Sequence, residues 1–310
     1  MGARPFGTDI NTSESEGPVV QGNLGDIFRM LQKRLFAPLP YWHWIKQAED
    51  HRLDENNRIV SESVQEFIRL ARDRMNNSPA LFDQPSNLLE AMIAARDENE
   101  SIFLDSELAG NIVTLLLAGE NTTAHSLAWF IYLAHQSPDV LLRIREEVDR
   151  IIGKDAVSTR HEQLGELDFI EACINESMRL RPSAPLVGVE ANHDTVVADV
   201  AIPKGTMILL LTRVGALKEM HFANPCAFRP DRWMTSVSES IHRKACMPFG
   251  AGPRLCPGRF LAIEEMKMVI TILVKNFDIS ALDTPDGKSV QKRLTFTMAP
   301  VGLQLKLRRR

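Results

Sequence analysis

The ten-residue segment Phe249–Gly258, with the sequence FGAGPRLCPG, constrains the fold of this chain more than any other stretch. It sets Cys256 among three glycines and two prolines, and an apolar-periodic stretch begins directly after it, at about Arg259. Glycines let a backbone pass close to a bulky group. Unpaired N–H groups and the dipole at a helix N-terminus favour a negatively charged sulfur. We therefore expect a rigid loop that presents the Cys256 thiolate as a metal ligand.

The other cysteines give no support for a disulfide framework. Cys173, Cys226 and Cys246 form no CxxC pair and show no disulfide-like spacing. This pattern favours a reducing compartment and one special thiol. The alternative for Cys256 is a buried structural cysteine in a turn. The formal net charge is only −4, so we expect no nucleic-acid partner.

Hydrophobic periodicity and chain breakers predict a mainly α protein with a small β portion. Residues 1–23 are rich in Gly, Ser, Thr, Glu and Pro, and we expect a flexible lead-in there. Helices are expected at residues 24–36, 49–76, 86–97 (with Ser86 as N-cap), 106–136, 138–150, 167–180 and 259–275. Short strands are expected within residues 186–211 and at 294–298 and 303–307, and an irregular segment at 217–246.

The longest apolar stretch, Leu108 to Ala134, is long enough to span a bilayer. However, residues 120–123 and His125 put polar groups at its middle, where a bilayer tolerates them least. We therefore expect a buried helix. The N-terminus has no signal-peptide pattern, and we expect a cytoplasmic protein, soluble as given. An anchor in an absent N-terminal part stays open.

The segment Phe249–Gly258 resembles the haem-binding loop of the cytochrome P450 family, Phe-Gly-x-Gly-x-Arg-x-Cys-x-Gly, and every fixed position is filled. The resemblance covers residues 24–310 and implies a cytochrome P450-like helical fold that lacks its N-terminal part. It implies haem b (iron protoporphyrin IX) with the Cys256 thiolate as iron ligand. Phe249, Gly250 and Gly258 would form the loop around the sulfur, and Arg254 would pair with a haem propionate. The place of a second propionate-binding arginine holds Val189.

Glu176 and Arg179 lie three residues apart and so share one helix face. An ordinary surface ion pair is the simplest reading of such a pair. Together with the segment FRPDRW at residues 228–233, however, the pattern resembles a buried network of the same family. The resemblance implies that Glu176, Arg179 and Arg232 form this network and serve folding and haem retention.

The segment Ala118–Thr123, with the sequence AGENTT, resembles the oxygen-activation motif of the family. The resemblance implies that Ala118 and Gly119 let the helix pass close to the haem, and that Thr122 is the alcohol of a proton relay. The acid position holds Asn121, an amide that cannot titrate. The adjacent Glu120 lies about 100° further around the helix. The alternative is a helix kink with satisfied polar side chains.

The family resemblance implies a haem-thiolate monooxygenase that inserts one oxygen atom from dioxygen into a small, hydrophobic organic substrate. A ferredoxin or a flavoprotein reductase would supply electrons, because no flavin- or nicotinamide-binding pattern follows. A basic patch could receive such a donor, or the same residues could belong to a charge-mixed surface; they are Arg243, Lys244, Arg254, Arg259 and Lys267. Two alternatives stay open: a haem-binding but catalytically weak or inactive truncated relative, and a helical protein that binds no haem.

Overall fold

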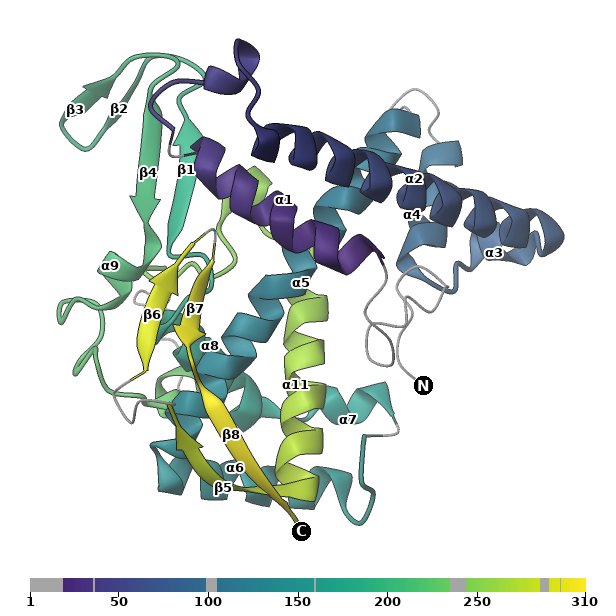
Figure 1. The fold of residues 1–310 in the computed structure, drawn as a ribbon. Helices are drawn as coiled ribbons and strands as arrows, with labels where there is room; N and C mark the ends of the chain where they lie inside the picture. The colour runs from purple at the N-terminus through teal and green to yellow at the C-terminus, as the bar shows by residue number, and fades with distance from the viewer. Residues whose placement is uncertain are drawn as a thin grey trace. The chain divides into compact units, whose positions relative to one another are not determined.

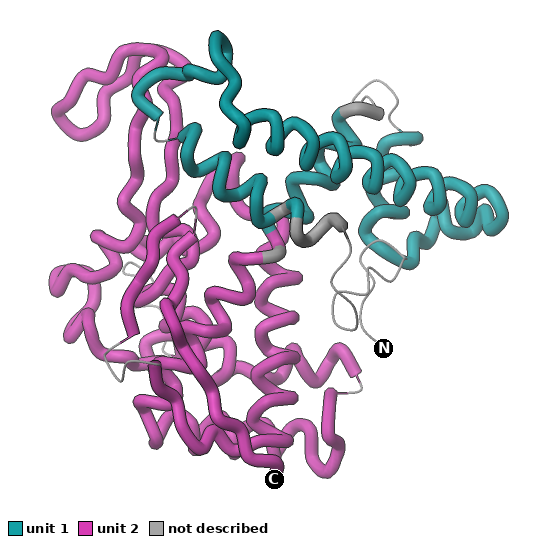
Figure 2. The backbone as a smooth tube through the Cα atoms, viewed as in Figure 1, with its two compact units in different colours: residues 1–118 teal, residues 119–310 magenta. Residues whose placement is uncertain are grey.

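A computed structural model describes residues 19–35, 37–98, 105–158, 160–234, 244–284, 290–295 and 297–310. The chain forms two compact units, residues 1–118 and residues 119–310 (Figure 2). Both units are built mostly from helices, and the strands of the described ranges lie in the second unit (Figure 1). No described helix combines the length and the apolar character needed to cross a bilayer. The expected cytoplasmic location stays a prediction.

The first unit is a set of packed helices. Its elements are α1 (Val19–Leu35), the 3₁₀ turn η1 (Tyr41–His43), α2 (Ala48–Asn77), α3 (Ala80–Asp83), α4 (Leu88–Glu98) and the first part of α5 (Asp105–His135). The long helix α2 buries Val60, Val64, Ile68 and Met75, which recur at helical spacing on one face. This face meets apolar residues of the other helices in one core, among them Ile27, Leu89, Ile93, Leu108 and Ile112.

The second unit holds the remaining part of α5 and the helices around it. These are α6 (Pro138–Ile152), α7 (His161–Gly165), α8 (Asp168–Leu180), α9 (Thr212–Ala216) and α11 (Arg259–Asn276). Its core combines apolar side chains of α5, α6, α7, α8 and α11, among them Phe130, Ile144, Val148, Leu164, Ile170, Ile174, Met266 and Ile270. The helix that follows the Cys256 loop therefore shares its core with the C-terminal half of α5.

The strands pair in four two-stranded antiparallel sheets within the described ranges. β1 (Leu186–Glu190) pairs with β4 (Met207–Leu211), and β2 (Thr195–Val197) pairs with β3 (Val200–Ile202). β5 (Phe277–Asp283) pairs with β8 (Gln304–Arg309), and β6 (Gln291–Leu294) pairs with β7 (Met298–Val301). This small β part beside many helices confirms the predicted fold class.

The long periodic helices are confirmed, with shifts at their ends. α2, α5, α6, α8 and α11 lie where the periodicity predicts them. α1 begins at Val19, ahead of the expected residue 24. Residues 1–18 of the expected lead-in lie outside the described residues. The short helices α3 and α7 and the strand β5 were not predicted.

Two local predictions are wrong. Ser86 is not the N-cap of α4: the amide of Glu90 donates to Asn87 Oδ1 at 3.0 Å, while the Ser86 amide and hydroxyl both donate to Glu90 Oε2. The run at residues 294–298 is not one strand. Leu294 ends β6, Met298 begins β7, and the Thr295 amide donates to the Thr297 carbonyl across the turn between them.

Candidate functional site

The Cys256 loop is held closed by its own backbone. The Cys256 amide donates to the carbonyl of Phe249 at 2.9 Å, and the Leu255 amide donates to the carbonyl of Gly252 at 3.0 Å. Gly250 and Gly252 have φ angles of 75° and 66°, in the left-handed region that glycine adopts at little cost. The glycines in the sequence therefore fix a compact turn, and α11 begins three residues after the cysteine, at Arg259.

Gly258 lies beside the sulfur of this loop. A Cβ built on Gly258 would lie 3.9 Å from Cys256 Sγ. Cys256 itself is half-buried, whereas residues 251–255 and Pro257 are exposed. The loop thus presents a half-buried cysteine on a backbone that its own hydrogen bonds hold closed.

The other cysteines differ from Cys256 in their surroundings. Cys173 is fully buried in the core, and burial raises the pKa of its thiol. Burial also raises the pKa of the Cys246 thiol to about 12. Both groups therefore stay protonated at neutral pH and are poor candidates for a thiolate ligand. Cys226 is exposed and lies in an irregular segment rather than ahead of a helix.

The polar segment of α5 continues the helix. Asn121 and Thr122 are half-buried, and the Ser126 hydroxyl donates to the carbonyl of Thr122 at 2.8 Å. A Cβ built on Gly119 meets no heavy atom within 4 Å among the described residues, so there is room beside the helix at this position. The side chain of Glu120 lies outside the described residues.

One turn further along α5, polar side chains attach the helix to the β6–β7 hairpin. His125 Nδ1 lies 2.9 Å from Thr297 Oγ1, and Trp129 Nε1 donates to the carbonyl of Met298 at 2.9 Å. Burial, assisted by the charge of Arg293, lowers the pKa of His125. His125 is therefore neutral at physiological pH and is placed as a hydrogen-bonding group.

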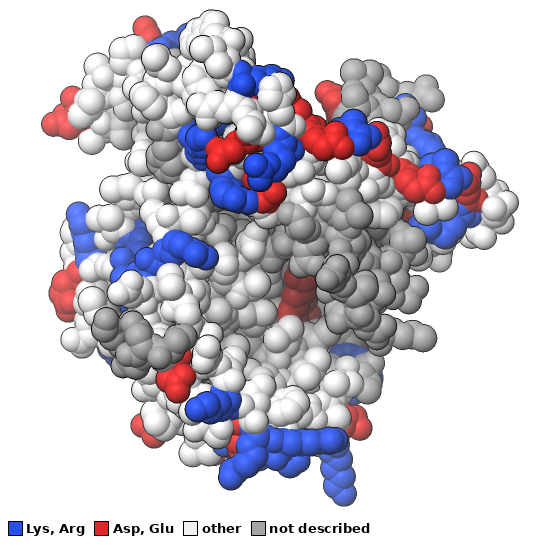
Figure 3. Space-filling model, in the orientation of Figure 1, with Lys and Arg blue, Asp and Glu red and all other residues white. Residues whose placement is uncertain are grey.

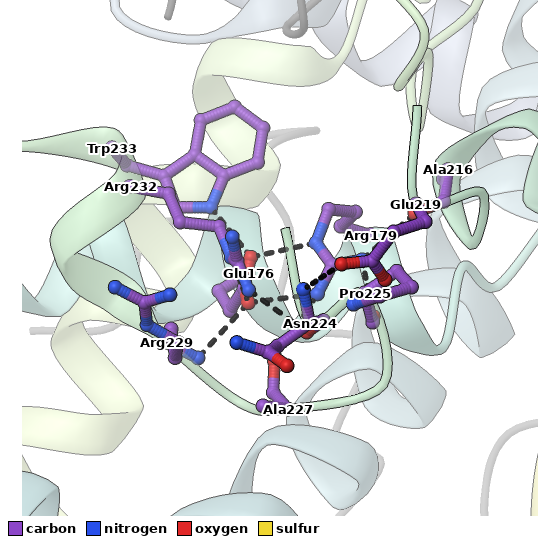
Figure 4. A network of polar contacts seen from close by, with 10 residues as sticks. All are labelled: Glu176, Arg179, Ala216, Glu219, Asn224, Pro225, Ala227, Arg229, Arg232 and Trp233. Carbon is purple, nitrogen blue, oxygen red and sulfur yellow. Dashed lines mark hydrogen bonds and ion pairs between the residues drawn. The ribbon is translucent and has the colours of Figure 1, made fainter. Parts of the chain in front are cut away.

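The structure brings Glu176, Arg179 and Arg232 together in a buried network (Figure 4). Arg179 is fully buried and donates from Nε and Nη2 to the two carboxylate oxygens of Glu176, each at 2.8 Å. Arg232 Nε donates to Glu176 Oε1 at 3.1 Å. This arrangement excludes the surface ion pair that the spacing alone allowed.

Arg179 also holds the backbone of the segment that follows α9. Its Nη1 donates to the carbonyls of Ala216 and Pro225, at 2.8 and 2.7 Å, and its Nη2 donates to the carbonyl of Ala227 at 3.2 Å. All five N–H donors of the guanidinium are thereby used. Only an arginine supplies this planar set of donors.

Sequence reasoning missed two members of the network. The indole Nε1 of Trp233 donates to Glu176 Oε2 at 3.0 Å, and the backbone amide of Arg229 donates to Glu176 Oε1 at 2.9 Å (Figure 4). Both lie in the FRPDRW segment that pointed to Arg232. The tryptophan beside Arg232 was the available signal, because a buried indole N–H needs an acceptor.

One residue of the predicted basic patch, Lys267, is not on the surface, and for the other residues the patch stays a prediction. Lys267 is 2% exposed, and its ammonium lies 2.6 Å from Glu171 Oε2 and 3.0 Å from the Leu164 carbonyl. It therefore joins α11 to α7 and α8 and cannot belong to a surface patch. Arg254 is exposed, and its pairing with a propionate stays a prediction. Arg243 lies outside the described residues.

Comparison with known proteins gives consistent matches. The family model described as Cytochrome P450 matches residues 5–307. The chain is 36% identical over 177 residues to the mitochondrial 1,25-dihydroxyvitamin D(3) 24-hydroxylase of Rattus norvegicus. This match covers 57% of this chain and 34% of that protein. It is 28% identical over 294 residues to Cytochrome P450 4d2 of Drosophila melanogaster, which covers 89% of this chain and 58% of that protein.

A solved structure, the crystal structure of the cytochrome P450DA heme domain, is similar along almost the whole chain. The TM-score is 0.81 at 26% sequence identity, and the match covers 98% of this chain and 64% of that chain. This chain thus spans between 34% and 64% of the lengths of these three proteins.

Proposed function

Because the chain belongs to the cytochrome P450 family, we propose that it binds haem b through the thiolate of Cys256. The observation that supports this most is the loop itself, in which the Phe249 carbonyl and two left-handed glycines hold a half-buried cysteine just ahead of α11. The bare Cα of Gly258 beside the sulfur and the open space beside Gly119 fit a large flat group. Arg254 would hold a propionate.

The activity that follows is that of a haem-thiolate monooxygenase. Bound haem supplies the iron at which dioxygen is activated and one oxygen atom is transferred. Cys256 provides the sulfur ligand, and Ala118 and Gly119 leave space beside α5. Thr122 would hold and pass a proton at Oγ1. The Asn121 amide would orient a water or the Thr122 hydroxyl by hydrogen bonding, because it has no proton to release.

The substrate we propose is a small, hydrophobic organic molecule, and the electrons come from a separate donor, either a ferredoxin or a flavoprotein reductase. The Glu176–Arg179–Arg232 network takes no part in the chemistry. Its role is to fix α8 against the segment that leads to the Cys256 loop, and so to retain the haem.

Spectroscopy of ferrous protein with carbon monoxide tests haem ligation by Cys256. We expect the strongly red-shifted Soret band of a thiolate-ligated haem in the parent chain. Cys256→Ser should abolish this band, while Cys226→Ser, which changes an exposed cysteine elsewhere, should leave it unchanged. Absence of haem from all three proteins, or the same band in Cys256→Ser, would refute the proposal.

A second candidate function is haem binding with weak or no turnover. Asn121 favours it, because an amide at the acid position of the motif cannot deliver protons. Reductant consumption with a surrogate donor and a panel of hydrophobic substrates separates the two functions. Substrate-dependent consumption with product formation supports the monooxygenase, and a haem spectrum without consumption supports the binding function.

A further inference from the structure

Two arginines from different elements share one carbonyl oxygen in the second unit. Arg181, directly after α8, donates from Nη1 to the carbonyl of Leu180 at 3.0 Å, and Arg213, in α9, donates from Nε to the same oxygen at 2.9 Å. Both side chains are half-buried. This shared acceptor fixes two guanidinium groups next to each other at the C-terminal end of α8.

A third cation joins them from the β6–β7 hairpin. The hairpin is attached to the residues after α8, because the Met298 amide donates to the Ser183 carbonyl at 2.8 Å. Arg181 also lies over the ring of Trp129, which itself donates to Met298. Lys292 lies in β6 of this hairpin, opposite Pro300 of β7. Burial and the charges of Arg181 and Arg213 lower the pKa of Lys292, as expected for a cation with two others nearby.

No carboxylate balances these three charges among the described residues. None of the three side chains makes an ion pair there, and Arg181 Nη2, both Nη atoms of Arg213 and Lys292 Nζ have no described acceptor. Arg181 Nε is closed off from solvent without a partner. Figure 3 shows Lys and Arg side chains gathered over α9 and the β6–β7 hairpin. Lys292 is exposed, whereas the two arginines are half-buried, and like charges held together with part of their hydration removed are unfavourable unless an anion joins them.

We propose that the Arg181–Arg213–Lys292 cluster binds the phosphate group of a small molecule. A phosphate carries up to two negative charges and three acceptor oxygens, so it can meet donors from all three elements at once. A carboxylate offers one charge and two oxygens. The two guanidinium groups are half-buried. A terminal phosphate on a small molecule can reach them more easily than a carboxylate on the surface of a folded protein can. This site shares no residue with the Cys256 loop and is not used by the proposed monooxygenase chemistry.

Titration of the purified 310-residue chain with inorganic phosphate tests the site. Calorimetry at neutral pH and constant ionic strength should give saturable binding at one site per chain, with acetate as the carboxylate control. We expect Arg213→Gln and Lys292→Gln each to weaken phosphate binding about tenfold or more, which corresponds to about 1.4 kcal/mol. Arg309→Gln removes an exposed charge from β8 instead, and should bind phosphate like the parent chain.

Lys292→Gln keeps the test valid if Arg213→Gln fails to fold, because the Lys292 side chain makes no described hydrogen bond that the fold would lose. Equal phosphate affinity in the parent chain, Lys292→Gln and Arg309→Gln would overturn the proposal. Acetate binding as tight as phosphate binding would overturn the choice of ligand. Binding of polyglutamate but not phosphate, lost in Lys292→Gln, would instead assign the cluster to an acidic protein partner.

Discussion

Replacing Glu176 by glutamine tests the buried network directly. The two oxygens of the Glu176 carboxylate accept five hydrogen bonds, two from Arg179 and one each from Arg232, Trp233 and the backbone amide of Arg229. Glutamine keeps the shape of the side chain but turns one acceptor oxygen into an NH₂ donor. Either orientation of the amide then sets donors against donors, and the charge of the fully buried Arg179 loses its counter-charge.

The expected cost follows from the burial of the pair. Removing one partner of a buried ion pair costs about 3–5 kcal/mol, because the other charge stays desolvated. A domain has a total stability of about 5–15 kcal/mol, so Glu176→Gln should remove a large part of it. Urea unfolding followed by helical circular dichroism measures the loss, and the haem content of the purified variant should fall with it.

Two further variants give this experiment its controls. Asp231→Asn breaks an exposed pair next to the network, in which Arg143 donates to both Asp231 oxygens, and should cost less than about 1 kcal/mol. Arg179→Lys keeps the charge but has fewer donors for the Ala216, Pro225 and Ala227 carbonyls, so we expect a loss closer to that of Glu176→Gln. If Glu176→Gln destabilises the chain no more than Asp231→Asn, the reasoning is wrong.

Three other predictions concern the relay, an acid and the thiols. Asn121→Asp should raise substrate-dependent reductant consumption if proton delivery limits turnover; unchanged turnover would rule out that limit. Burial acts to raise the pKa of Glu90, but hydrogen bonds outweigh burial and lower this pKa. The ionised Glu90 side chain therefore stabilises the fold fully above the unfolded-state pKa of about 4.3. This stabilisation is lost as the pH falls through the folded-state pKa. Glu90→Gln should therefore destabilise the chain at neutral pH and approach the parent in acid, and a pH-independent difference in urea midpoints would contradict this. Iodoacetamide should modify Cys226 in the native chain but not Cys173 or Cys246, as mass spectrometry would show, and equal native rates would contradict it.

The sequence predicts the elements whose signal is local and repeated. The apolar positions of α2 and α5 recur over many turns, so their type and length follow from periodicity alone. α7 has five residues, too few for a period to appear. β5 follows α11 directly, with no Gly or Pro between them, so no turn signal marks the start of a strand there.

In the candidate functional site, too, the features that can be predicted are those with a local sequence signal. The loop motif and the Glu176–Arg179 spacing are local, so the sequence contains them. The carbonyls of Ala216, Pro225 and Ala227 are not predictable, because every residue has a carbonyl and only the tertiary fold selects three of them. The prediction that Lys267 lies on the surface was wrong because a lysine in an amphipathic helix is usually exposed. Only the partners of Lys267 on α7 and α8 show that it is buried.

The single arginine at the end of α8 has a consequence for the order in which this protein folds. Between Ala216 and Pro230 the chain has no helix or strand of its own. Two carbonyls of this segment, together with the Ala216 carbonyl at the end of α9, accept hydrogen bonds from Arg179. A carbonyl that loses water and gains no donor is unfavourable, so we expect this segment to become ordered only when α8 has formed and presents the guanidinium. We therefore expect the segment between α9 and η2 to fold late, after α8 and against it.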